Sequence, residues 1–258
     1  KTLKMSMLEC FFSVRYRDRK DLFDNLYISG DAEYMKLQGT YPVIFVSFAA
    51  VKQTNCLDAI RQIKVIISDV YSQFPELYTS DKLNDGQRKL LASVSRNMDD
   101  VTAQNALNDL SSLLTSHYGK KVIVLLDEYD TPLQEAYING YWQEMTSFIR
   151  SLFNATFKSN RHLERAVMTG ITRVSKESIF SDLNNLNVIT SMNDRYADCF
   201  GFTEKETFAA LDSFGLGEYK DAVKRWYDGF SFGHVNDIYN PWSITNYIDK
   251  RQFRPYWV

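Results

Sequence analysis

A run of five apolar residues, 122–126, ends directly in front of a group of acids. The stretch reads VIVLLDEYD, so that Asp127, Glu128 and Asp130 follow the apolar run. A short run that is apolar on both faces predicts a buried strand of a parallel sheet, here at about residues 121–126. Such a strand has no place for a charge until it leaves the sheet. We therefore expect Asp127 and Glu128 to project at the tip of a buried strand.

Short strands and amphipathic helices alternate along the first part of the chain. PVIFVSF at residues 42–48 and RAVMTG at residues 165–170 also have the pattern of short strands. Helical spacing of apolar residues predicts helices over roughly 57–74, 87–118 and 142–157. This alternation is typical of a parallel sheet between layers of helices, in which ligands gather at the carboxyl ends of strands.

The pattern changes after about residue 200, where the sequence predicts helices only. Thr203 and Glu206 form a capping box at the start of one expected helix, and Pro241 suits the first position of another. We therefore expect a core domain over residues 1–200 and a helical subdomain over residues 201–258.

Composition narrows the partners without naming one. Thirty basic and thirty-two acidic residues leave a net charge of −2, which supplies no global field for nucleic acid or anionic lipid. The net charge does not exclude a local basic patch that binds such a partner. The sequence contains no apolar run near the roughly 18 residues that a membrane span needs, and it does not begin with the pattern of a secretory signal. We therefore expect no membrane partner. The three cysteines are dispersed, which predicts reduced thiols and a cytoplasmic protein.

Paired acids at a strand end suit the chemistry of phosphoryl transfer. In nucleotide hydrolases the first carboxylate holds the Mg²⁺ shell, and the adjacent carboxylate polarises the attacking water. The alternative is an ordinary strand end followed by a solvated acidic turn. The pattern at Asp127 and Glu128 does not by itself decide between these two interpretations.

The chain opens with KTLKMSML, a Lys-Thr pair directly before an amphipathic helix. The last two residues of a phosphate-binding loop, G-x-x-x-x-G-K-[ST], stand in this way at the start of their helix. In this interpretation Lys1 reaches the β and γ phosphates, and Thr2 offers its hydroxyl to Mg²⁺. A Lys-Thr pair is by itself a weak motif, and no glycines stand before this one. We expect the glycine loop and its strand to precede Lys1 in the natural protein.

Five blocks follow one another in a fixed order along the chain. They are KTLKMSMLECFF, VIVLLDEYDTPL, MTGITRVSKESIFSDLNNL, WYDGFSFG and IYNPWSITNYI. Through these blocks the sequence resembles the AAA-ATPase-like proteins of bacteria across essentially its whole length. In fuller members of that family the first block continues from an upstream RRFGKT, and a PD-(D/E)XK nuclease-like domain often follows the last block.

The resemblance implies a P-loop NTPase fold, an α/β three-layer αβα sandwich with a parallel sheet and a helical lid after it. It also implies roles for individual residues. Asp127 matches the Mg²⁺-coordinating acid, and Glu128 matches the catalytic base. Thr169 falls where related ATPases keep a polar sensor of the γ phosphate or the water. Arg173 is a candidate for a γ-phosphate-sensing or finger arginine, with a surface loop arginine as the alternative.

The leading hypothesis is an ATP-binding module that hydrolyses ATP with Mg²⁺. The alternative is a non-hydrolysing nucleotide switch or scaffold that regulates an attached nuclease-like domain. Direct contact with nucleic acid is a third hypothesis, which the net charge does not support. A homo-oligomer is a further partner arrangement that the sequence leaves open.

Overall fold

The computed structural model describes residues 1–172, 183 and 186–257. Within it the chain divides into two compact units, Lys1–Asn185 and Leu186–Val258. Each unit has an apolar core of its own. The units divide before the boundary near residue 200 that the sequence predicts. No helix in the described ranges is both long enough and apolar enough to cross a membrane.

The first unit alternates short strands with helices, as the sequence predicts. Its elements are α1 (Thr2–Phe12), α2 (Ala32–Met35), β1 (Val43–Ser47), α3 (Cys56–Tyr71), α4 (Asp85–Ser93), α5 (Asp100–Tyr118), β2 (Val122–Asp127), α6 (Thr131–Asn139), α7 (Trp142–Phe153) and β3 (Leu163–Met168). The single helix expected over residues 87–118 is instead two helices, α4 and α5. They separate because Asp99 caps α5, where its side chain accepts a hydrogen bond from the Thr102 amide at 2.9 Å.

The three strands of this unit form a parallel sheet in the order β1-β2-β3. Ser47 at the end of β1 pairs with Asp127 at the end of β2. On the other side of β2, Leu126 pairs with Met168 at the end of β3. The parallel sheet of the expected α/β fold is thus confirmed, and the carboxyl ends of all three strands lie at one edge.

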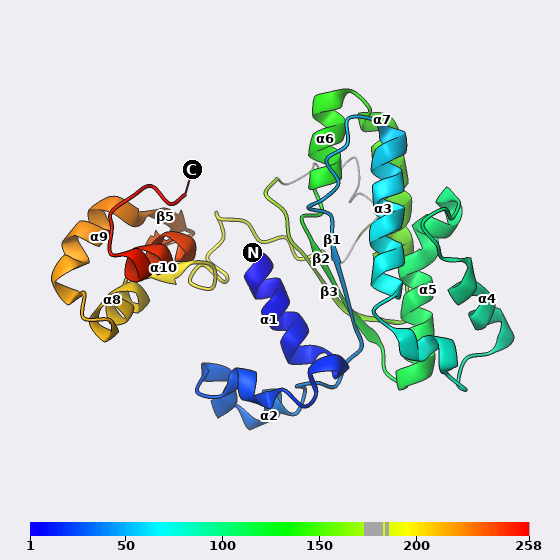
Figure 1. Ribbon diagram of the computed structural model, residues 1–258, viewed down its shortest axis with the longest axis horizontal. Coiled ribbons are helices and arrows are strands. Elements are labelled where there is room, and N and C mark those ends of the chain that lie inside the picture. Colours follow the sequence, from blue (N-terminus) through cyan, green and yellow to red (C-terminus); the bar gives the residue numbers. More distant parts are fainter. Residues whose placement is uncertain (173–182, 184–185, 258) are drawn as a thin grey trace. The chain divides into compact units, whose positions relative to one another are not determined.

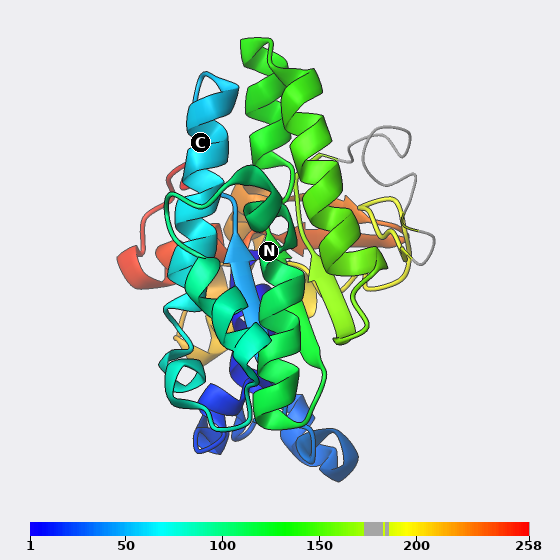
Figure 2. The ribbon, with the colours of Figure 1, turned by 90° about the vertical axis from the view of Figure 1, so that its right-hand side faces the viewer.

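Helices cover both faces of the sheet (Figure 1). On one face Ile123 and Leu125 pack with Met5 of α1 in a small buried cluster. On the other face Val124 and Leu126 join a larger core that includes residues of α3, α5 and α7. Figure 2 views the sheet from the side of these three helices, which run along the strands that they cover.

Every residue of β2 is buried, which is why this strand anchors the sheet. Each large apolar side chain that folding removes from water contributes roughly 1.5–3 kcal/mol. The alternating side chains of residues 122–126 reach both cores, so the strand cannot shift by one residue without exchanging its two faces. The strand runs one residue further than expected, because Asp127 still belongs to it.

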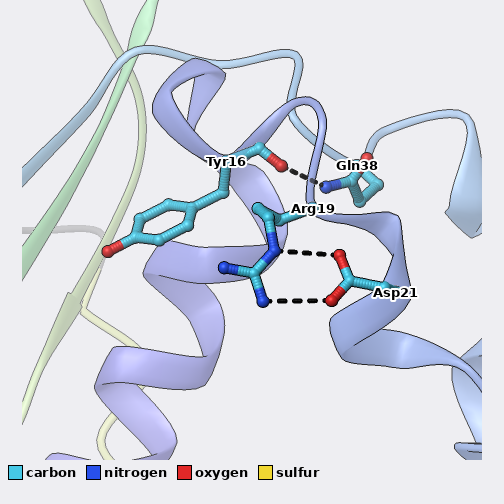
Figure 3. A network of polar contacts seen from close by, with 4 residues as sticks. All are labelled: Tyr16, Arg19, Asp21 and Gln38. Atoms are coloured by element: carbon cyan, nitrogen blue, oxygen red, sulfur yellow. Dashed lines mark hydrogen bonds and ion pairs between the residues drawn. The ribbon is translucent and has the colours of Figure 1, made fainter.

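Residues 13–40 form a long connection between α1 and β1, and polar contacts within it are shown in Figure 3. The side-chain amide of Gln38 donates to the carbonyl oxygen of Tyr16 at 2.9 Å. Arg19 donates two hydrogen bonds to the Asp21 carboxylate, at 2.9 and 3.0 Å. Because Tyr16 follows α1 and Gln38 precedes β1, the first contact keeps the end of the helix close to the start of the strand.

The second unit combines helices with a small antiparallel sheet. Its elements are β4 (Phe202–Thr203), α8 (Glu204–Ser213), α9 (Lys220–Tyr227), β5 (Asp228–Phe232), β6 (Val235–Tyr239) and α10 (Pro241–Lys250), with the strand order β4-β6-β5. The expected capping box is confirmed: the Thr203 hydroxyl accepts from the Glu206 amide, and the Glu206 carboxylate accepts from the Thr203 amide. Pro241 is the first residue of its helix, as expected.

The expectation of helices alone after residue 200 is wrong. β5 and β6 form an antiparallel hairpin in which Phe232 pairs with Val235 across a two-residue loop. Such loops need a positive φ, and Gly233 supplies it at 52°. The strand pattern in DGFSF is short, and among the described residues its strand partner is β6. Tertiary pairing therefore decided the conformation of this segment.

Candidate functional site

The carboxyl edge of the parallel sheet gathers side chains from distant parts of the chain. Asp127 ends β2, Thr169 directly follows β3, and Thr2 is the first residue of α1. The Thr2 hydroxyl donates to Oδ2 of Asp127 at 2.7 Å. The Thr169 hydroxyl donates to Oδ1 of the same carboxylate. The structure therefore brings together three of the residues that the sequence predicts as a site.

The Asp127 carboxylate is buried, with 1% of the residue exposed. Burial of a carboxylate costs free energy unless hydrogen bonds compensate. Among the residues that the structure describes, its side chain accepts hydrogen bonds from the hydroxyls of Thr2 and Thr169 and from no cationic side chain. Within the described part of the chain, hydroxyl donors hold the carboxylate and no cationic side chain neutralises it. Hydroxyl and carboxylate oxygens are also the ligands that Mg²⁺ prefers.

Lys1 stands at the N-cap position of α1, and its side chain is exposed. Its carbonyl oxygen accepts a hydrogen bond from the Met5 amide at 3.1 Å, which begins the helix. The amino end of a helix carries a partial positive charge and amides without helical partners. Because Thr2 contacts Asp127, this helix end belongs to the same edge as the strand ends.

Glu128 follows Asp127 with a φ of 54°, in the left-handed region. This conformation costs a residue other than glycine roughly 1–2 kcal/mol. It turns the chain out of the sheet, and the Glu128 carbonyl oxygen accepts a hydrogen bond from the Thr131 amide at the start of α6, at 3.2 Å. Glu128 is half-buried, and within the described ranges its carboxylate accepts no hydrogen bond.

Thr169 is held by its backbone on both sides. Its amide donates to the carbonyl oxygen of Leu126 at 2.9 Å, and its own carbonyl oxygen accepts from the Tyr129 amide at 3.0 Å. These bonds continue the pairing of β2 and β3 beyond the end of β3, which keeps the Thr169 hydroxyl at Asp127. Arg173, the remaining predicted site residue, lies outside the described residues.

Asp130 received no role from the sequence, although it stands three positions after Asp127. It is fully buried, and its Oδ2 accepts hydrogen bonds from the backbone amides of Ile171 and Thr172. An acid near a strand end was the signal available in the sequence. Its partners lie 41 and 42 positions further along the chain, so only the fold reveals them.

A separate hollow of about 530 Å³ lies among α3, α5 and α7. None of the predicted site residues lines it. Burial, together with the nearby charges of Glu144 and Asp100, raises the pKa of the Cys56 thiol beside it. Because carboxylates repel phosphate groups, this hollow does not suit a nucleotide. Its lining residues are Ile60, Asp100, Gln104, Gln143, Glu144, Ser147 and Phe148.

Comparison with known proteins identifies the family. The model of the AAA-ATPase-like family, described as predicted AAA-ATPases, matches residues 1–180. The chain is also 35% identical over 141 residues to a protein of Azotobacter chroococcum mcd 1, named "Uncharacterized protein in vnfD 5'region". This similarity covers 54% of the chain but spans only 27% of the relative. No solved structure matches the chain. Because the family model covers well over half of its residues, the chain belongs to the AAA-ATPase-like family.

Proposed function

We propose that this chain is an ATP-binding module that hydrolyses ATP with Mg²⁺. The observation that carries the proposal is the 2.7 Å hydrogen bond between Thr2 and Asp127, which stand 125 positions apart. A Lys-Thr pair before a helix and an acid at the end of a buried strand are the two halves of a P-loop nucleotide site. Membership of the AAA-ATPase-like family supports nucleotide binding.

The oxygens at the sheet edge suit a magnesium ion. Mg²⁺ binds proteins through one or two carboxylates together with substrate phosphates. Thr2 and Asp127 supply a hydroxyl and a carboxylate oxygen, and Asp127 accepts from no cationic side chain among the described residues. In the proposed site these two residues hold the ion. Mg²⁺ bound there would neutralise the charge that develops on the phosphates.

The remaining predicted residues position the phosphates and the attacking water. Lys1 binds the β and γ phosphates through its exposed amine. Glu128 orients the attacking water and accepts its proton, because its carboxylate has no hydrogen-bond donor within the described ranges. Thr169 orients the γ phosphate or the water from the end of β3. Arg173 senses the γ phosphate in this proposal.

The binding half of the proposal is tested with Lys1→Ala in the full-length natural chain. Titration with a fluorescent ATP analogue and Mg²⁺ should show that this variant loses nucleotide binding, because a phosphate contact is gone. Lys4→Ala is the matched control, since Lys4 is also an exposed lysine of α1. Equal affinity of the Lys1→Ala variant and the wild type would contradict the proposed site.

The hydrolysis half is tested with Glu128→Gln, which keeps the shape of the side chain. Nucleotide binding should persist, while phosphate release should fall by about 10²–10⁴-fold, the usual contribution of a general base. Glu164→Gln is the control, because Glu164 is an exposed carboxylate on β3. Tight binding with the same slow turnover in wild type and Glu128→Gln would instead indicate a non-hydrolysing nucleotide switch.

A further inference from the structure

Asp130 fastens the segment after β3 to the turn after β2. Its Oδ2 accepts hydrogen bonds from the backbone amides of Ile171 and Thr172, at 2.8 and 2.5 Å. The side-chain amide of Gln134 donates to the same oxygen at 2.7 Å. Amide hydrogen bonds to a carboxylate are among the stronger ones in proteins. One buried oxygen atom therefore joins three donors from two segments.

Two further hydrogen bonds strengthen this junction. The Tyr129 hydroxyl donates to the carbonyl oxygen of Thr172 at 2.8 Å. The side-chain amide of Gln134 also donates to the Thr172 hydroxyl at 2.8 Å. We refer to the contacts of Tyr129, Asp130 and Gln134 with residues 170–172 as the Asp130 clamp. Four of these hydrogen bonds join the turn after β2 or the start of α6 to residues 171 and 172. The fifth, from Gln134, supports the Asp130 carboxylate itself.

Gly170 lets the two segments approach this closely. A Cβ atom at this position would lie 2.5 Å from Oδ1 of Asp130 and 2.7 Å from the ring of Tyr129. Oδ1 is buried and has no hydrogen-bond partner among the described residues. An unsatisfied buried oxygen destabilises the folded state, and the three hydrogen bonds to Oδ2 oppose this loss. The contact with Gly170 is therefore tight although Oδ1 gains no hydrogen bond from it.

The clamp adds to the contacts that hold the end of β3. The residues in the middle of β3, 164–167, are exposed, whereas Met168 at its end is partly buried against the larger core. Thr169 has to keep its hydroxyl on Asp127. Residues 170–172 directly follow Thr169, and the clamp holds them against the turn that directly follows Asp127.

We infer that Asp130 is a positioning residue, which acts through Thr169 by holding the segment after β3 so that the Thr169 hydroxyl stays on Asp127. The inference rests on the proposed ATPase function. Asp130 does not touch nucleotide in the proposed site. Its effect should therefore fall on turnover rather than on nucleotide affinity, because small displacements of a positioned group reduce the rate of a reaction strongly.

The test compares Asp130→Asn and Gly170→Ala with the wild type in the full-length natural chain. Asparagine can still accept from the backbone amides, but its NH₂ group would face Gly170 without an acceptor. Alanine at position 170 forces the segments apart while both carboxylates stay intact. We expect kcat for ATP hydrolysis to fall by about tenfold in each variant, as for loss of the Thr169 hydroxyl itself, with KM nearly unchanged. The matched control is Asp99→Asn, because Asp99 caps α5 far from the sheet edge in sequence and carries the same chemical change.

Hydrogen exchange provides a readout that needs no turnover. The Ile171 and Thr172 amides should exchange about tenfold faster in Asp130→Asn and in Gly170→Ala than in the wild type, because their acceptor is weakened or displaced. The Asp99→Asn control should leave both amides unchanged. Where Asp130→Asn does not fold, Gly170→Ala carries both measurements.

A double variant shows whether Asp130 acts through Thr169. Thr169→Val removes the hydroxyl that the clamp is inferred to position. In a Thr169→Val background, Asp130→Asn should lower kcat little further, because coupled residues are not additive. A full additional loss would mean that Asp130 acts on its own, which overturns the inference.

The outcomes separate the inference from the proposed function. Unchanged exchange at Ile171 and Thr172, or faster exchange with unchanged kcat, overturns the positioning role while the ATPase proposal stands. A wild type that binds nucleotide without turnover overturns the proposed hydrolysis and with it the catalytic part of the inference. Loss of kcat with faster exchange and preserved KM supports the inference.

Discussion

β2 is buried along its whole length, whereas the residues in the middle of its neighbour β3, 164–167, are exposed. Both strands deliver a residue to the same edge, Asp127 from β2 and Thr169 from the end of β3. Apolar cores on both faces hold β2. The segment after β3 is held by hydrogen bonds, above all those that Asp130 accepts from Ile171 and Thr172.

This difference shows that one site can use two kinds of support. Packing resists displacement in every direction, because any shift of a buried side chain opens a cavity or creates a clash. Hydrogen bonds can break and re-form with a moderate change of free energy. We therefore expect the Asp127 side of the site to be the rigid one, and the Thr169 side to be the one that substitutions disturb selectively.

The largest expected effect separates the two strand ends in catalysis. Asp127→Asn should lower Mg²⁺-dependent phosphate release by about 10²–10³-fold, the range for loss of one major electrostatic group. Thr169→Val should lower it only about tenfold, because it removes one hydrogen bond worth about 1.4 kcal/mol. Steady-state kinetics at saturating ATP and Mg²⁺ measures both. Equal losses would show that the two strand ends contribute equally.

An intermediate effect concerns stability, with the same substitution made in each strand. Val124→Ala in β2 removes two methyl groups from a fully buried site and should lower the free energy of unfolding by about 2 kcal/mol. Val167 in β3 is 38% exposed, so Val167→Ala should cost about 0.5 kcal/mol or less. Urea unfolding followed by circular dichroism measures both. A Val167→Ala loss as large as that of Val124→Ala would mean that packing also supports the middle of β3.

The smallest expected effect is a pH-dependent change in stability that arises from α5, one of the helices that cover β2. Burial raises the pKa of Asp109 on α5 above its ordinary value of 3.8, so the folded state binds this proton more tightly than the unfolded state. The free energy of unfolding that Asp109 contributes is therefore highest below pH 3.8 and falls as pH rises through the raised pKa. Asp109→Asn should be more stable than the wild type at pH 7 by about 0.5 kcal/mol or less, because solvent screens a partly exposed group.

Urea unfolding of Asp109→Asn and the wild type at pH 7 and at low pH measures this difference. The advantage of the variant should disappear below pH 3.8, where both side chains are neutral. An advantage that does not change with pH would instead reflect helix propensity or packing rather than the buried charge.

The strands were predictable to the degree that their own residues are buried. β2 was expected at residues 121–126 and lies at Val122–Asp127, because its apolar run is packed on both faces. The third strand was expected at residues 165–170 and lies at Leu163–Met168. The exposed Glu164 carries no apolar signal, and pairing with β2 decides where this strand begins.

The site was predictable where short motifs carried it. The Lys-Thr pair, the acids after an apolar run and the threonine after a strand each stand out in the sequence, and the fold places Thr2, Asp127 and Thr169 together. Asp130 did not stand out as a positioning residue, because its amide partners lie in another loop. The hairpin of β5 and β6 was missed for the same reason, since its hydrogen bonds join two short segments.

The sequence by itself determined which segment is the central strand and where that strand meets its first charge. Exposure of a continuous apolar run to water is too unfavourable in free energy, so such a run is buried whatever its neighbours are. Only the tertiary structure decided that α1 brings Thr2 to Asp127, and that Asp130 closes on the backbone after Gly170. Those contacts join residues far apart in the chain, and they exist only after the register of the sheet has placed their elements side by side.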